Sequence, residues 1–351
     1  MTLIDVITPV RDGLLHLPNC AASLLDQELP PGAVRWVVID DASHDGTARW
    51  LDSAAAGSGL DIWWGRLEEP GGAGAARNVG LDNVRGQFVT FLDVDDTLDR
   101  GALAAWVDAI TRLSADLLLT PAPRGLSRRR QARWRHGPRL LTHHQRWSSD
   151  AMRTWLVGGK VYRAEMLRGI GFPESPEAED LAFFSDALLR ATAVGFSGPA
   201  PRYHYDRPST STSLRPMQQP VSVLDTYGET VLRLRDAAPD PRAFESVSSP
   251  VWAGQCAAYL RAVAHASPED VSVLSSRLRL WWDQLGLDLP RDLGRLDRRD
   301  VSQVALARLC QASPGVAKSV GSGWIHAAQL RASRRPSWPG MSARTENTPR
   351  T

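Results

Sequence analysis

Two patterns of hydrophobic and polar residues alternate over the first third of the chain. One is a short apolar, β-branched run of strand length, and the other is a segment with apolar residues at helical spacing. Such runs are typical of strands that are buried on both faces of a parallel sheet. The expected strands are residues 3–10, 35–39, 61–64 and 88–92, and helices alternate with them up to residues 102–113. The pattern therefore predicts an α/β fold, a Rossmann-like and mostly parallel sheet with helices on both faces.

From residue 217 onward the apolar positions take helical spacing and strand signals become sparse. Amphipathic helices are expected over 223–234, 251–263, 271–285 and 301–310, with prolines between them. Residues 334–351 combine Pro, Ser, Arg and Asn with almost no apolar side chain, which is typical of a disordered tail. We therefore expect three segments: an α/β domain over 1–216, a helical accessory region over 217–333 and a tail over 334–351.

The strand at 88–92 ends in three acidic residues, Asp93, Asp95 and Asp96. Because side chains alternate along a strand, Asp93 and Asp95 are expected on the same side, at the edge where open α/β sheets bind ligands. Two carboxylates form a hard oxygen site that suits Mg²⁺ or Mn²⁺, completed by substrate phosphates. The alternative is structural, a polar turn that caps the helix that follows.

Two further polar features fall at the same edge of the expected sheet. Asp40 and Asp41 follow the strand at 35–39, and a glycine-rich run at 71–74 opens a helix that carries Arg77. A helix N-terminus and an arginine suit a diphosphate, and Asp41 could accept a hydrogen bond from a nucleobase imide or a ribose hydroxyl. The glycines match a dinucleotide fingerprint weakly, because they lie outside the first βα turn and arginine replaces the third glycine.

Four motifs stand in a fixed order over the first hundred or so residues: Val6-Ile-Thr-Pro-Val-Arg11, Val37-Val-Ile-Asp-Asp-Ala-Ser-His-Asp-Gly46, Gly74-Ala-Ala-Arg-Asn-Val-Gly80 and Phe91-Leu-Asp-Val-Asp-Asp96. Together they resemble the inverting family-two glycosyltransferases, which have a GT-A fold. The resemblance implies a nucleotide-diphosphate sugar donor, with UDP-sugars favoured, and Mg²⁺ or Mn²⁺ on Asp95. It implies donor contacts from Pro9, Val10, Arg11, Asp41, Arg77, Asp93 and Val94. One departure is that Arg11-Asp12 replaces the aromatic–Asn pair usual after this proline, so the donor's base stays open.

Glu179 and Asp180 stand at the start of another expected helix, where acids also stabilise the positive end of the helix. Direct displacement at an anomeric carbon needs one base for the acceptor hydroxyl. The Lys160-Val-Tyr-Arg163 block and the Glu179-Asp180 pair again resemble the family, whose aspartate in this pair is the catalytic base. The resemblance therefore implies that Asp180 is catalytic, with Glu179 as the substitute. Three polar residues further on could face the diphosphate: His204, Arg207 and Ser209.

Composition bears on the compartment more than on the fold. The 351 residues carry a net charge of +2, and Cys20, Cys256 and Cys310 show no metal-ligand spacing, which favours a reducing compartment. The chain opens without a basic, apolar leader, and no run approaches the ~20 apolar residues of a membrane span. We therefore expect a cytoplasmic protein.

The segment Arg124–Arg146 is rich in arginine, contains Trp134 and has no acidic residue. It could bind an anionic polymer or the lipid phosphates at the inner face of a membrane, and nucleic acid is the least favoured partner. The alternative is a solvated surface loop, because runs of charge are usually just hydrated.

These features favour a metal-dependent inverting glycosyltransferase acting on a glycan or lipid-linked acceptor. By analogy with the family, the product is expected to be a bacterial cell-envelope polysaccharide or glycoconjugate. A nucleotidyltransferase would need a glycine-rich loop with a catalytic Lys or Arg near the N-terminus, where only Gly13 stands. A degenerate transferase that serves as a scaffold would need neither the aspartate pair nor Asp180, so their presence argues against it.

Overall fold

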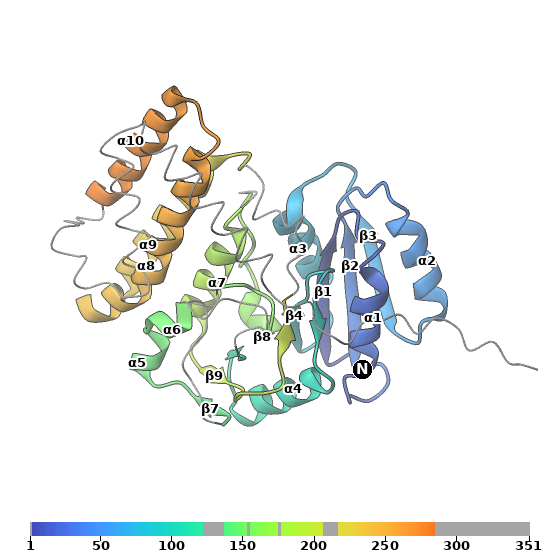
Figure 1. The fold of residues 1–351 in the computed structure, drawn as a ribbon. Coiled ribbons are helices and arrows are strands. Elements are labelled where there is room, and N and C mark those ends of the chain that lie inside the picture. Colours follow the sequence, from blue (N-terminus) through green and yellow to red (C-terminus); the bar gives the residue numbers. More distant parts are fainter. Residues whose placement is uncertain (1, 122–136, 153–154, 175–176, 206–216, 285–351) are drawn as a thin grey trace, which may run out of the picture.

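The computed structural model describes residues 2–121, 137–152, 155–174, 177–205 and 217–284. Within these ranges an α/β part with a central sheet packs against a group of long helices (Figure 1). No helix in the described ranges is long and apolar enough to cross a membrane. The helix expected over 301–310 and the tail expected over 334–351 lie outside the described residues.

The central sheet has eight strands in the order β3-β2-β1-β4-β8-β6-β9-β7. Its parallel half is formed by β3 (Asp61–Arg66), β2 (Val34–Asp40), β1 (Ile4–Val10) and β4 (Phe88–Phe91). The expected mostly parallel sheet is thus confirmed over the first four strands. Beyond them, β8 (Lys160–Arg163) is antiparallel both to β4 and to β6 (Leu117–Leu119). β6 pairs in parallel with β9 (Val194–Phe196). β7 (Arg139–Leu140) forms the edge of the sheet and is antiparallel to β9.

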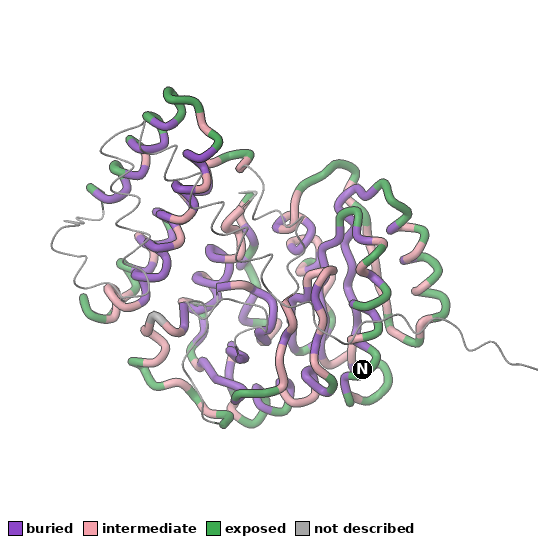
Figure 2. Tube along the Cα trace, viewed as in Figure 1, coloured by how far each residue is buried: buried purple, intermediate pink, exposed green. Residues whose placement is uncertain are grey.

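The period-two pattern of the strands divides the core into two layers. Val6 and Trp36 point to one face and Ile7 and Val37 to the other, and all four are fully buried (Figure 2). The first face is covered by α1 (Leu17–Leu25), α2 (Thr47–Gly57) and α4 (Ala102–Arg112); the second is covered by α3 (Gly72–Asp82) and α7 (Glu179–Arg190). Two short helices, α5 (His143–Arg146) and α6 (Ser149–Met152), precede β8. Helices therefore cover both faces, as expected.

The last described part consists of α8 (Pro220–Ala237), α9 (Pro241–Val263) and α10 (Pro268–Gln284). The expectation of helices here is confirmed, but α9 begins at Pro241, ten residues before the expected start at Val251, and runs through Pro250. α8 packs on α7 and α9 packs on α6, so Phe184 of the α/β part and Val231 of α8 belong to one hydrophobic core. The expected boundary at 216/217 adjoins residues outside the described ranges.

Candidate active site

The candidate residues gather where β1, β2 and β4 end. Asp41 follows β2 directly, and its backbone N–H donates to the carbonyl of Val10 at 2.8 Å, which ties the ends of β1 and β2 together. Pro9 and Val10 are buried in β1, whereas Arg11 is exposed just beyond it. The ends of β1 and β2 therefore lie side by side at one edge of the sheet.

The loop after β1 is clamped to the loop after β2 by reciprocal hydrogen bonds. The Asp12 N–H donates to Ser43 Oγ, and the carboxylate of Asp12 accepts from the N–H of His44, each at 2.8 Å. Asp12 has a φ of 49°, a left-handed conformation that Asp and Asn tolerate better than most side chains. An aspartate thus provides the turn at the position where the family usually has asparagine.

Asp41 is buried, and both of its carboxylate oxygens are engaged by the glycine-rich run. They accept backbone N–H bonds from Gly71 at 2.6 Å and Gly72 at 3.1 Å. These bonds fix the start of α3, the helix that carries Arg77. The contact of Asp41 with a nucleobase or ribose stays a prediction, because in this structure the carboxylate orders the loop.

The acidic element after β4 is a turn, not a continuation of the strand. β4 ends at Phe91, and the N–H of Asp96 donates to the carbonyl of Asp93 at 3.0 Å. Alternation along a strand therefore does not apply to Asp93 and Asp95, because the chain has already turned, and their position on one side stays a prediction. Asp93, Val94 and Asp95 are partly exposed on this turn, while Asp96 is buried.

Tyr203, on β10 (Tyr203–His204), holds the acidic turn from behind. Its hydroxyl donates to the Asp96 carboxylate and accepts the backbone N–H of Asp93 at 3.1 Å. The ring fits because Gly158 faces it: a Cβ at that position would lie 2.8 Å from the ring. This role was missed in the sequence, where no local signal links Tyr203 to a turn that lies over a hundred positions earlier.

The diphosphate contact expected of His204, Arg207 and Ser209 stays a prediction. The Nε2 atom of His204 lies 2.5 Å from Asp99 Oδ1, so this ring is paired with an acid. Arg207 and Ser209 lie outside the described residues.

Arg77 is the centre of the site, although its contacts differ from the expected one. Its side chain is 3% exposed; its guanidinium donates to Asp93 at 2.7 Å, to Asp180 at 2.7 Å and to Glu179 at 3.1 Å. Burial lowers the pKa of Arg77, but Asp180, Asp93 and Glu179 raise it well above the ordinary value. The implied contact with a diphosphate stays a prediction: in this structure Nη1 and Nη2 donate to carboxylates, while Nε has no hydrogen-bond partner among the described residues.

Glu179 and Asp180 form the first turn of α7, as the sequence predicted. The Asp180 carboxylate accepts from Arg77 and from the N–H of Val157, at 3.3 Å. Burial raises the pKa of Asp180, while Arg77 opposes the rise. Burial and the charge of Asp180 raise the pKa of Glu179 to about 7. A carboxylate with a raised pKa is a stronger base, which suits proton abstraction near neutral pH.

Lys160 adds a buried amine beside Asp180. Its Nζ donates to the carbonyl of Leu156 and lies 4.9 Å from the ring centroid of Phe184. Burial lowers the pKa of Lys160 to about 7, and the charge of Asp180 opposes that shift. The Lys160 block was expected here only by resemblance, and the contact of Lys160 with Phe184 places its amine against α7, the helix that carries the acid pair.

The donor set at the acidic turn suits a hard cation that brings its own phosphate ligands. Among the residues that the structure describes, no three His, Cys, Asp or Glu side chains gather as a metal-binding cluster. Asp93 and Asp95 lie together on the turn after β4, and one oxygen of Asp93 accepts from Arg77. Mg²⁺ with few protein ligands and substrate phosphates fits such a pair.

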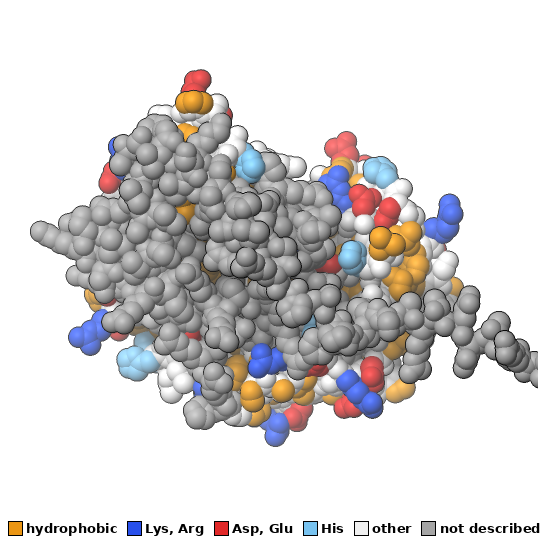
Figure 3. Space-filling view, in the orientation of Figure 1, with side chains coloured by type: hydrophobic (Ala, Val, Ile, Leu, Met, Phe, Trp, Pro, Cys, Tyr) orange, Lys and Arg blue, Asp and Glu red, His pale blue; other side chains and the backbone are white. Residues whose placement is uncertain are grey.

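The arginine-rich segment Arg124–Arg146 is described only from residue 137 onward, so the expected anionic partner concerns residues that lie largely outside the described ranges. Arg139 lies over the ring of Phe196, and Arg146 donates to the carbonyls of Leu188 and Leu189. These two arginines serve internal contacts. Basic and acidic side chains are mixed along the visible rim of the molecule in Figure 3, which shows no single-sign patch among its described residues.

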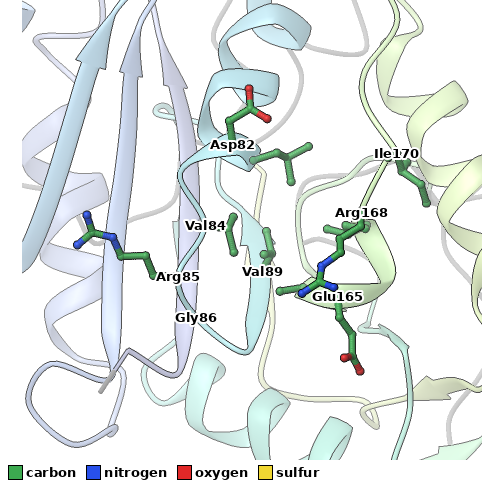
Figure 4. Close-up of a pocket in the computed structure, with 12 residues that line it drawn as sticks. Asp82, Val84, Arg85, Gly86, Val89, Glu165, Arg168 and Ile170 are labelled. Atoms are coloured by element: carbon green, nitrogen blue, oxygen red, sulfur yellow. The ribbon is translucent and has the colours of Figure 1, made fainter.

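A hollow of about 500 Å³ lies at the opposite end of β4, between α3 and the segment 164–170. Apolar and charged side chains line it together: Asp82 and Glu165 face opposite ends, Arg85 extends away, and the guanidinium of Arg168 lies beside Glu165 (Figure 4). None of the site residues predicted from the sequence lines this hollow, so the candidate site is the edge with Arg77.

Comparison with known proteins identifies the α/β part. Residues 5–170 match the family described as "Glycosyl transferase family 2". These residues form a domain of this family. The matched residues run from β1 through β8 and include the acidic turn and Arg77, while Asp180 lies ten residues beyond the match.

Two curated proteins are similar in sequence to this chain. TuaG of Bacillus subtilis, named as a teichuronic acid biosynthesis glycosyltransferase, is 27% identical over 220 residues, which is 60% of this chain and 82% of TuaG. TarS of Staphylococcus aureus, a poly(ribitol-phosphate) β-N-acetylglucosaminyltransferase, is 29% identical over 201 residues, 55% of this chain and 34% of TarS. The matched region thus spans only a third of TarS.

Solved structures show that the fold likeness extends into the helical region. Residues 1–349 of S. aureus TarS in complex with UDP superpose with a TM-score of 0.69 at 19% identity, covering 93% of this chain and 92% of that one. The mannosyltransferase PcManGT from Pyrobaculum calidifontis, in complex with GDP-Man and Mn²⁺, gives a TM-score of 0.53 at 15% identity, with 94% and 87% coverage. At these identities the likeness shows the GT-A type fold.

Proposed function

We propose that this chain is an inverting glycosyltransferase that moves a sugar from a UDP-sugar to a hydroxyl of a cell-envelope polymer. Membership of family 2 supports the reaction class. The names of TuaG and TarS, which refer to teichuronic acid and poly(ribitol-phosphate), support an envelope polymer as acceptor. The TarS structures with UDP and UDP-GlcNAc support the choice of a uridine donor.

The observation that carries the proposal is the bridge made by Arg77. One guanidinium contacts Asp93 of the acidic turn and Asp180 of α7, so the donor-binding element and the base lie within the span of a single side chain. A displacement at the anomeric carbon needs this proximity, because the acceptor oxygen and the leaving diphosphate flank the same carbon.

In the proposed reaction, the acceptor hydroxyl oxygen attacks the anomeric carbon and forms the new glycosidic bond. The bond from that carbon to the diphosphate oxygen breaks, and its electron pair leaves with UDP. The carboxylate of Asp180 takes the hydroxyl proton, and its raised pKa makes it a competent base. Attack opposite to the leaving group inverts the configuration at the carbon.

Mg²⁺ or Mn²⁺, held by Asp95 with Asp93, would neutralise charge on the leaving diphosphate. The structure supports this by placing both carboxylates, partly exposed, on one turn at the end of β4. Arg77 then has a positioning role: its hydrogen bonds hold the carboxylates of Asp93 and Asp180 in place. The acceptor itself, glycan or lipid-linked, and the contact with a membrane face remain part of the proposal.

A thermal-shift screen tests the donor site directly. UDP, GDP, CDP and dTDP are added with and without Mn²⁺ to the wild type and to Asp95→Ala. We expect UDP to raise the melting temperature in a metal-dependent way, since a ligand at 100 times its Kd adds about 2.7 kcal/mol. The Asp95→Ala variant should lose the metal dependence. A shift with UDP that is the same with and without Mn²⁺ would remove the metal from the proposal.

A non-catalytic scaffold is the competing function, and the variant Asp180→Asn separates the two. If the chain is an enzyme, Asp180→Asn should still bind UDP but release no UDP from a UDP-sugar. If the chain is a scaffold, the wild type itself will release none. The nucleotidyltransferase alternative has no support from the family match.

A further inference from the structure

The backbone that leads into α7 is strained, and no side-chain hydrogen bond caps the start of this helix. Ala178 is the N-cap of α7, and its φ is 65°, in the left-handed region. Alanine avoids that region because of its Cβ, so such a residue persists only where its surroundings hold it. Glu179 and Asp180 follow at once. The direction of the proposed base therefore depends on whatever fixes this turn.

On the inner side the turn is held by Arg77, through its bonds to Glu179 and Asp180. On the outer side it is held from the helical region. Arg261, in the last turn of α9, pairs with Glu177, the residue before Ala178. The Arg261 side chain is 11% exposed, and burial lowers its pKa to about 10, so it stays charged at neutral pH. A buried charge of this kind is stabilised by its acid partner.

Two further contacts join the helical region to the same site. Arg233 of α8 pairs with Asp186 of α7 at 3.0 Å. Tyr227 of α8 meets Trp155 edge to face at 6.2 Å between centroids; Val157, two residues on, donates its N–H to Asp180. Gly254 of α9 allows this approach, since a Cβ there would lie 2.6 Å from Tyr227. Figure 1 shows α7 lying between the sheet and the pair α8–α9.

We propose that Arg261 is a positioning residue for the catalytic carboxylate, so that the helical region takes part in catalysis by holding the turn before Asp180. The inference rests on the proposed function, because it takes Asp180 as the base. It gives a role to a part of the chain that the family match does not reach.

The test compares Arg261→Met, Arg261→Lys and a matched control, Arg277→Met. Arg277 lies on α10 and makes a two-pronged pair with Asp225 at 2.5 and 2.8 Å, away from α7. Loss of the Arg277–Asp225 pair should affect the helical region without changing the turn at Glu177–Ala178. Amide hydrogen exchange, measured on the full chain, reports the stability of that turn and does not require enzymatic activity. The reporters are the amides of Leu181 and Ala182, which donate to the carbonyl of Ala178.

We expect these two amides to exchange roughly tenfold faster in Arg261→Met and at the wild-type rate in Arg277→Met. Arg261→Lys, which keeps a positive charge, should restore part of the protection. Unchanged exchange in Arg261→Met would overturn the inference, and so would an equal rise in both Met variants, since that would show general loosening.

Steady-state release of UDP from UDP-N-acetylglucosamine with Mn²⁺ gives the second readout. In Arg261→Met kcat should fall roughly 10- to 100-fold with the KM for the donor unchanged, because a displaced base slows the chemical step without weakening donor binding. A KM effect with kcat unchanged would contradict the inference. A wild type that releases no UDP would count against the proposed function, while the exchange experiment would still decide the role of Arg261.

Discussion

Arg77 joins the acids of the site into one network. Three carboxylates share a single buried guanidinium, so none of Asp93, Glu179 and Asp180 is a charge isolated in the interior. The arrangement also affects protonation: the pKa of Glu179 is raised to about 7, so this side chain is partly protonated at neutral pH. Its proton reduces the repulsion of the charge on Asp180.

Removing the guanidinium should therefore destabilise the whole protein. In Arg77→Met the buried carboxylates lose their common partner, and we expect the free energy of unfolding to fall by about 3–5 kcal/mol. Urea unfolding followed by circular dichroism measures the change. Arg100→Met is the matched control: its pairs with Asp26 and Glu28 are exposed, so the urea midpoint should not move measurably. Equal midpoints for the two variants would contradict the role of Arg77.

The acid pair should also set the pH dependence. The folded-state pKa of Glu179, about 7, lies above its ordinary value of 4.5, so the folded state holds more protons between these values. Its contribution to stability is then present at pH 4.5 and is lost as pH rises through 7. The Glu179→Gln variant should show less of this decline in urea unfolding at a series of pH values. A decline as steep as that of the wild type would exclude Glu179 as its source.

The elements that meet at the site could be predicted to different degrees. The parallel strands, the glycine-rich start of α3 and the acids at the start of α7 follow from local patterns, because apolar period and helix capping are properties of neighbouring residues. The shape of the acidic turn and the bridge from Arg77 to Asp180 could not be predicted, since these residues are 103 positions apart. The length of α9 was also misjudged: packing overrides the local cost of Pro250.

Tyr203 shows how a short strand shapes the proposed metal site. We expect Tyr203→Phe to lower the free energy of unfolding by about 1–3 kcal/mol, because Asp96 loses a buried hydrogen-bond donor. The turn should then hold Asp93 and Asp95 less firmly, so the Mn²⁺-dependent part of the thermal shift with UDP should shrink. Tyr259→Phe, which removes a buried hydroxyl bonded to Ser275 in the helical region, is the control. It should lose stability while keeping the full response to Mn²⁺; a shrunken response in both variants would refute the local explanation.

The α/β part and the helical region share one hydrophobic core in the described residues, which joins Phe184 of α7 to Leu260 of α9. A core that crosses a boundary between two parts makes them unfold together. The sequence suggested a separate accessory region because the pattern changes near residue 217. The change in pattern marks a change in the type of element, and the division into separate domains stays a prediction.

Cooperative unfolding can be tested at Gly228, where α8 meets α10 far from the sheet. A Cβ at this position would lie 2.1 Å from the ring of Trp281, so Gly228→Ala must displace the tryptophan, a strain that typically costs about 1–3 kcal/mol. We expect one transition, with circular dichroism and tryptophan fluorescence melting together at a lower temperature than in the wild type. Gly57→Ala, with nothing within 4 Å of the added methyl group, should leave the melting temperature unchanged or slightly raised. Two separate transitions in Gly228→Ala, with only the first shifted, would show that the helical region unfolds by itself and would weaken its assigned part in holding the base.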